Sequence, residues 1–210
     1  MRAAIVVLAL AAACRTPPSD PPPAPESGEP RDYPGTLRAP DSMGPDIQWR
    51  QRVTAQWGER KESFEAVLSK ADAELLLVGL SPMGQPGFVL RYAGVDIEFE
   101  NRSHRELPFP PRYIVLDVQR TFFPWIPGPP PTEGERSHRV DGEVVHERWS
   151  DGRLQQRRFE REDGQPAGAI EISYHGWEDG ADAPRRAVLD NGWFGYRLTI
   201  ETVDQQRLPE

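Results

Sequence analysis

Residues Ile47–Trp57, with the sequence IQWRQRVTAQW, decide the fold because their side chains change character at every step. The even-numbered positions carry only Gln, Arg and Thr. The odd-numbered positions carry Ile47, Trp49, Gln51, Val53, Ala55 and Trp57. Successive side chains of a strand point to opposite faces, so this pattern predicts a strand with one apolar face and one wet face.

The same period of two continues toward the C-terminus. A turn at 58–61 leads to a second predicted strand over 64–68, and later turns separate strands over 88–92 and 95–99. Between them, Glu74–Leu80 is apolar on both faces, so we expect both faces to be covered.

Asp-Gly pairs organise the C-terminal third. Three such pairs, at 141–142, 151–152 and 163–164, have the chemistry of hairpin turns. A further turn is expected at Asn191-Gly192. The strands that these turns separate are predicted over 143–149, 154–162, 169–177, 187–190 and 196–202.

The period changes near the middle of the chain. Proline suits the first turn of a helix, and Pro124 cannot continue one, so we expect a helix over 111–123. One side of this helix carries Ile114, Val115, Val118 and Phe122, and the opposite side includes Tyr113, Asp117 and Arg120. The Pro-rich and Gly-rich stretch 124–134 that follows predicts a loop.

These elements predict one mainly β domain over residues 46–207. Roughly nine or ten antiparallel strands in meander order would form a strongly curved sheet, or half-open barrel. The helix would lie across its apolar inner face as a lid. Exposed apolar surface costs about 25 cal/mol per Å², so either side chains and the helix fill the concave side or a lipid does.

The N-terminus has the features of a bacterial lipoprotein signal. An apolar run, 3–13, follows Arg2 and ends in small residues directly before Cys14, the single cysteine. The run is shorter than the roughly 20 residues that span a bilayer and resembles the apolar region of a signal peptide. We therefore expect residues 1–13 to be removed and Cys14 to be lipidated. An ordinary secretory signal and a buried N-terminal helix are the alternatives.

Lipidation would anchor the chain to a membrane outside the cytoplasm, because several acyl chains on one cysteine hold stably. Arg15 follows Cys14, whereas lipoproteins retained in the inner membrane often have Asp there. We therefore expect the outer membrane, with the domain facing the periplasm. Residues 14–45 are rich in Pro, Ser, Gly, Asp and Glu, which predicts a disordered tether. A proline-rich ligand for a partner protein is the alternative.

Charge and motifs exclude several kinds of function. The net charge of −8 argues against nucleic acid, because phosphate binding requires clustered Lys and Arg. The four histidines, at 104, 138, 146 and 175, form no HxH or HExxH pattern, so we predict no metal site and no cofactor. No GxSxG motif is present, and we predict no enzyme, with a hydrolase as the alternative.

The apolar run 75–84 (LLLVGLSPMG), the helix between Pro110 and Pro124, and the final 195–200 (GYRLTI) resemble the DUF3261 family of bacterial lipoproteins. More distantly, the arrangement resembles the LolA/LolB lipoprotein carriers. This resemblance implies a half-open barrel with a helical lid over an apolar cavity that receives acyl chains. It also implies that Pro82 and Met83 form a protruding loop tip that contacts membrane or cargo. Some DUF3261 members lie in gene clusters for aryl-polyene pigments, which suggests a polyene-type lipid.

We therefore predict that the protein binds or transfers a membrane lipid or acylated cargo. The alternative is an assembly module with a filled core that binds another envelope protein through a sheet edge. The tryptophans fit either hypothesis, as core packing or as cavity lining. The side chains expected to line a cavity are Trp49, Val53, Trp57, Phe64, Leu68, Leu77, Phe88, Leu90, Ile97, Phe99, Ile114, Val118 and Phe122.

Overall fold

The computed structural model describes residues 33–209, apart from residue 82 and residues 103–109. The predicted signal peptide, Cys14, the first part of the tether and Pro82 therefore lie outside the described residues. Residues Asp32–Glu210 form one compact unit.

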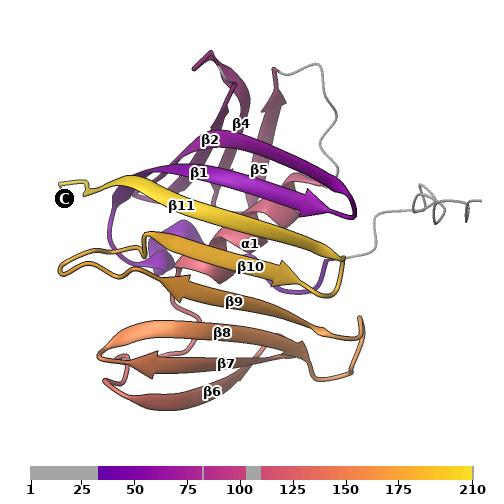
Figure 1. Cartoon of the computed structure of the whole chain (residues 1–210), viewed down its shortest axis with the longest axis vertical. Helices are drawn as coiled ribbons and strands as arrows, with labels where there is room; N and C mark the ends of the chain where they lie inside the picture. The colour runs from indigo at the N-terminus through magenta and orange to yellow at the C-terminus, as the bar shows by residue number, and fades with distance from the viewer. Residues whose placement is uncertain (1–32, 82, 103–109, 210) are drawn as a thin grey trace, which may run out of the picture. The chain divides into compact units, whose positions relative to one another are not determined.

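A single sheet of eleven antiparallel strands makes up most of this unit (Figure 1). A short 3-10 helix, η1 (Pro40–Met43), precedes the sheet, and α1 (Pro111–Phe122) connects its two halves. The strands are β1 (Ile47–Trp57), β2 (Arg60–Ala71), β3 (Glu74–Leu80), β4 (Pro86–Ala93), β5 (Asp96–Asn101), β6 (Gly134–Val140), β7 (Glu143–Ser150), β8 (Arg153–Arg161), β9 (Ala169–His175), β10 (Arg186–Asn191) and β11 (Tyr196–Arg207).

The strand order is β5-β4-β3-β2-β1-β11-β10-β9-β8-β7-β6. The chain therefore runs from the centre to one edge, passes through α1 to the other edge, and returns to the centre. There β1 pairs with β2 on one side and with β11 on the other along its whole length. The sheet stays open at β5 and β6. The predicted class, an unclosed antiparallel sheet with one helix, is confirmed.

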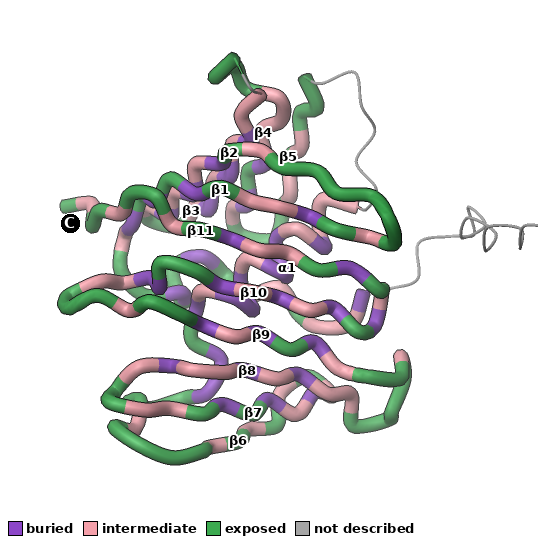
Figure 2. Tube along the Cα trace, in the orientation of Figure 1, coloured by how far each residue is buried: buried purple, intermediate pink, exposed green. Residues whose placement is uncertain are grey.

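Helix α1 lies against one face of the sheet and separates two buried clusters. Tyr113 and Leu116 pack with side chains of β7–β11. Val115, and Phe123 directly after the helix, pack with side chains of β1–β4. Buried and exposed residues alternate along the central strands (Figure 2). The alternation in β1 follows the period of two that its sequence predicted, with the even positions mostly exposed.

Three local predictions were wrong. Residues 33–45 are not all tether, because Tyr33 and Met43 are buried in the two clusters. Strand β6 falls on a segment with no predicted strand, since its sequence, GERSHRV, carries no apolar alternation. The turn after β10 spans residues 192–195 rather than Asn191-Gly192 alone.

Candidate functional site

The inner face of β1–β5 carries two rows of side chains that the register defines. One row runs across the strands from Trp49, and its members are Trp49, Leu68, Leu77, Leu90 and Phe99. The next row begins at Gln51 and continues with Ala66, Gly79 and Phe88. The first row therefore consists of large apolar side chains, whereas the second row has its smallest residues, Ala66 and Gly79, at its centre.

Part of this face is not fully covered. Nine apolar side chains pack against the buried cluster of β1–β4 but remain partly exposed. One of them, Leu37, precedes the sheet, and we call the other eight the apolar mouth. Five come from strands and three come from α1. The residues of the apolar mouth are Val53, Phe64, Phe88, Ile97, Phe99, Ile114, Val118 and Phe122. Their rings lie close together, with centroids 5.8 Å apart for Phe64 and Phe88 and 6.0 Å apart for Phe88 and Phe99.

The structure brings most of the predicted lining residues together. All eight members of the apolar mouth are among them. Four more, Trp49, Leu68, Leu77 and Leu90, are at most 7% exposed and form the floor beneath it. Trp57 is the exception, because it packs against the cluster of the other half of the sheet.

Gly79 determines the position of one ring in the mouth. A Cβ atom at this position would lie 2.1 Å from Cε1 of Phe88, so only glycine lets that ring lie over β3. The pairing of β3 with β4 also shifts register between Gly79 and Leu80. The ring of Phe88 is itself only partly buried. Its side chain therefore has solvent on one side.

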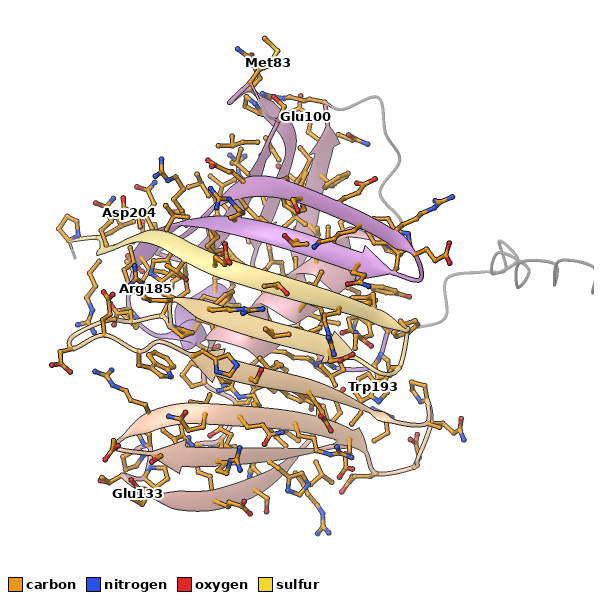
Figure 3. All side chains as sticks on the ribbon, viewed as in Figure 1. Met83, Glu100, Glu133, Arg185, Trp193 and Asp204 are labelled. Atoms are coloured by element: carbon orange, nitrogen blue, oxygen red, sulfur yellow. The ribbon has the colours of Figure 1, made fainter. Side chains whose placement is uncertain are left out.

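The connection between β3 and β4 presents Met83. The backbone amide of Ser81 donates to the carbonyl of Gln85 over 2.8 Å, and the amide of Gly84 donates to the carbonyl of Ser81 over 2.8 Å. This narrow turn leaves Met83 88% exposed, at the end of the hairpin (Figure 3). The predicted protruding position is therefore accessible, and its contact with membrane or cargo remains a prediction.

Sequence reasoning missed a buried polar cluster on the other side of α1. The Asp117 carboxylate accepts hydrogen bonds from the hydroxyls of Tyr33 and Tyr196. The Asn191 amide donates to the Tyr33 hydroxyl over 2.7 Å. Burial raises the pKa of Asp117 from 3.8 to about 6, although both tyrosine hydrogen bonds oppose that shift.

Arg120 is a second member of this polar cluster and is fully buried. It pairs with Glu143 over 2.6 Å, and its guanidinium lies 4.7 Å from the ring centroid of Tyr33 and 5.2 Å from that of Trp193. The side of α1 that holds Asp117 and Arg120 is thus buried, whereas Ile114, Val118 and Phe122 on the apolar side stay partly exposed. Charged residues on a helix normally indicate a solvated face. No local signal in the sequence therefore indicated that Asp117 and Arg120 are buried.

Polar side chains of α1 bind residues 33–38 to the helix. Arg112 donates to the carbonyl of Tyr33 over 2.6 Å, and Arg120 donates to the carbonyl of Pro34 over 2.6 Å. The Gln119 amide oxygen accepts from the backbone amide of Arg38 over 3.0 Å, while its nitrogen donates to the Arg38 carbonyl over 2.9 Å. These contacts fix the position of α1 and give the polar cluster a structural role.

Other features of the described residues offer little chemistry. Within the described ranges, no group of three or more His, Cys, Asp or Glu side chains is placed to hold a metal ion. A hollow of about 520 Å³ over β6–β8 is lined by polar side chains that pair with one another, such as Arg158 with Glu160 over 2.6 Å.

No helix in the part of the chain that the structure describes is long and apolar enough to span a membrane.

Comparison with solved structures finds distant similarity. A LolA superfamily protein from Nitrosomonas europaea has a TM-score of 0.49 and 11% identity, covering 82% of this chain and 90% of that one. A domain assigned to outer membrane lipoprotein sorting, from Vibrio parahaemolyticus, has a TM-score of 0.47 and 11% identity, covering 81% and 90%. The Mycobacterium tuberculosis lipoprotein LppX has a TM-score of 0.34 and 10% identity, covering 78% and 88%.

No curated protein matches the sequence. The sequence model of DUF3261, a family described as a protein of unknown function, matches residues 48–204, which is more than half of the chain. The resemblance that the strand and helix motifs indicated is thereby confirmed, and the chain belongs to the DUF3261 family.

Proposed function

We propose that this protein binds an acyl chain, from a membrane lipid or an acylated protein, in the apolar mouth. The observation that supports the proposal is the set of eight apolar side chains that stay partly exposed beside a buried floor. Covering one such side chain completely stabilises a complex by up to about 1.5–3 kcal/mol, so a chain lying across several of them gains substantially. The described residues of the mouth and of its floor are all apolar, which favours binding or transfer as the role.

The proposal includes a place for the protein. Cys14 would carry the lipid anchor, in the outer membrane with the domain facing the periplasm. The residues between Cys14 and Tyr33 would act as the tether. Met83 would contact the membrane or the cargo, because an exposed apolar tip partitions favourably into the interfacial region of a bilayer.

A second candidate function is an envelope assembly module that binds a partner protein through a sheet edge. The open edges at β5 and β6 favour it, since an edge strand offers unpaired backbone groups to another chain. On this hypothesis the floor residues and α1 would simply fill the core.

Ligand extraction tests the proposed function. The chain from residue 14 to 210, with Cys14→Ser, is purified from cells, extracted with solvent and analysed by mass spectrometry, and its binding of the apolar fluorophore diphenylhexatriene is titrated. We expect a co-purifying acyl lipid and saturable fluorophore binding.

Two matched valine variants, one in the mouth and one outside it, test whether the fluorophore binds in the mouth. Val118→Asp places a charge in the apolar mouth and is expected to weaken fluorophore binding by about tenfold or more. Val95→Asp lies in the exposed turn after β4 and is expected to change nothing. Absence of any lipid together with no fluorophore binding would rule out the proposed function and favour the assembly module.

A further inference from the structure

Two buried hydrogen-bond donors on the inner face of β1 lack an acceptor among the described residues. They are Nε1 of Trp49 and Nε2 of Gln51. Trp49 is 2% exposed and Gln51 is 3% exposed. Folded proteins satisfy nearly all buried polar groups, because an unpaired donor forfeits its hydrogen bonds to water. Two such donors at consecutive inward positions of one strand therefore need an explanation.

Both donors border the apolar mouth. The ring of Trp49 packs edge-on against that of Phe122, with centroids 5.2 Å apart. Gln51 lies between Trp49 and Val53 along the inner face of β1. The residues that carry the two donors are thus neighbours of the mouth residues Phe122 and Val53.

The sheet provides space beside Gln51. Its neighbour on β2 is Ala66, and the next residue across, on β3, is Gly79. These are the two smallest side chains of the row, and the ring of Phe88 covers Gly79. Phe88 is partly exposed, and a ligand that reaches Gln51 across β3 and β2 would have to displace its ring from Gly79.

Among the described residues, the other buried side-chain polar atoms without a partner belong to a different region. They are on Arg120, Thr121 and Glu143, and Arg120 and Glu143 already form an ion pair with each other. By contrast, Trp49 and Gln51 are neutral, and neither has a partner for its nitrogen within the described part of the chain.

We propose that Trp49 and Gln51 form a polar subsite that donates hydrogen bonds to the carbonyl oxygen of an acyl ester or amide. The inference rests on the proposed function and adds the chemical class of the ligand. The acyl tail would cross β2–β5 over the rings of Phe64, Phe88 and Phe99. A neutral carbonyl fits better than a carboxylate, because neither donor carries the positive charge that a buried carboxylate requires.

Two fluorescent probes separate the subsite from the mouth. Methyl parinarate carries a polyene chain and an ester carbonyl, whereas diphenylhexatriene carries no hydrogen-bond acceptor. Both are titrated into the chain of residues 14–210 with Cys14→Ser. We expect both to bind the unmodified site, because both are apolar enough to enter the mouth.

The decisive variant is Gln51→Leu, which keeps the size and removes the donor. We expect it to weaken methyl parinarate binding by about tenfold and to leave diphenylhexatriene binding within about twofold. Trp49→Phe should weaken the ester in the same selective way. Gln56→Leu, on the exposed outer face of the same strand, is the matched control and should alter neither probe.

Infrared spectroscopy gives a readout that does not depend on the variants. The ester C=O stretch of bound methyl parinarate should lie at lower wavenumber than in hydrocarbon solvent, because hydrogen bonding weakens the bond. Equal ester affinity in Gln51→Leu, or an unshifted stretch, would overturn the subsite while leaving the proposed function intact. If the site binds neither probe, the proposed function fails and the subsite fails with it.

Discussion

At the scale of single residues, Asp117 gives the domain a specific dependence on pH. Burial raises its pKa from 3.8 to about 6, so the folded state holds this proton more tightly than the unfolded chain does. Its contribution to stability is therefore greatest below about pH 4 and falls as the pH rises through about 6. The shift corresponds to about 3 kcal/mol.

Asp117→Asn removes this titration and keeps the size of the side chain. We expect the free energy of unfolding of the unmodified protein to fall, relative to that of the variant, by about 3 kcal/mol between pH 4 and pH 7. Urea unfolding of both proteins at the two pH values measures the difference, and comparison with the variant cancels the other carboxylates. Parallel pH profiles would contradict the assignment.

The residue scale also shows where sequence reasoning stops. Alternation placed Trp49, Phe64 and Phe88 on the inner face, because the period of a strand is a local property. Nothing local indicated that Asp117 meets Tyr33, which lies 84 positions away. A carboxylate becomes a core residue only when distant partners supply its hydrogen bonds, and the sequence does not encode those partners nearby.

At the scale of elements, prediction succeeded where the local signal was strong. Both bounds of β1 agree with its alternation, and the Asp-Gly turns at 141–142 and 151–152 have the positive φ angles that such turns require. Strand β6 was missed because an edge strand with mostly polar side chains looks like a loop. Strand β6 forms by pairing with β7 rather than through a hydrophobic pattern of its own.

The hairpin of β3 and β4 carries the prediction that belongs to this scale. Met83 is 88% exposed, so Met83→Asp should change the free energy of unfolding by less than about 0.5 kcal/mol. The same change should weaken association with phospholipid vesicles, because it replaces an apolar tip with a charge. Vesicle co-sedimentation of the chain without its anchor measures this, with Val95→Asp as the exposed control. Unchanged co-sedimentation would show that the tip does not contact lipid.

At the scale of the whole molecule, the two ends of the described chain stabilise its centre. The final strand, β11, pairs with β1, so the sheet is completed only when both ends are present. Pairing between strands so far apart leaves no local trace, and the sequence predicted a meander without this junction. The polar cluster extends the same principle, since Tyr33 from one end and Tyr196 from the other meet on α1.

Residues 33–45 should therefore behave as part of the domain rather than as tether. Tyr33 is 1% exposed and Met43 is 2% exposed, and removing buried side chains of this size costs about 2–5 kcal/mol each. A chain that begins at residue 46 also loses the carbonyls that accept from Arg112 and Arg120. Its combined loss is comparable to the whole stability of a typical domain, about 5–15 kcal/mol.

We expect the chain that begins at residue 46 to unfold at much lower urea concentration than the chain that begins at residue 33, or not to fold at all. The chain that begins at residue 14, with Cys14→Ser, should match the one that begins at 33, because the added residues are the proposed tether. Urea titrations followed by tryptophan fluorescence compare the three. Equal midpoints for the chains beginning at 46 and 33 would mean that the contacts of Tyr33 and Met43 contribute no stability and that the tether extends to residue 45.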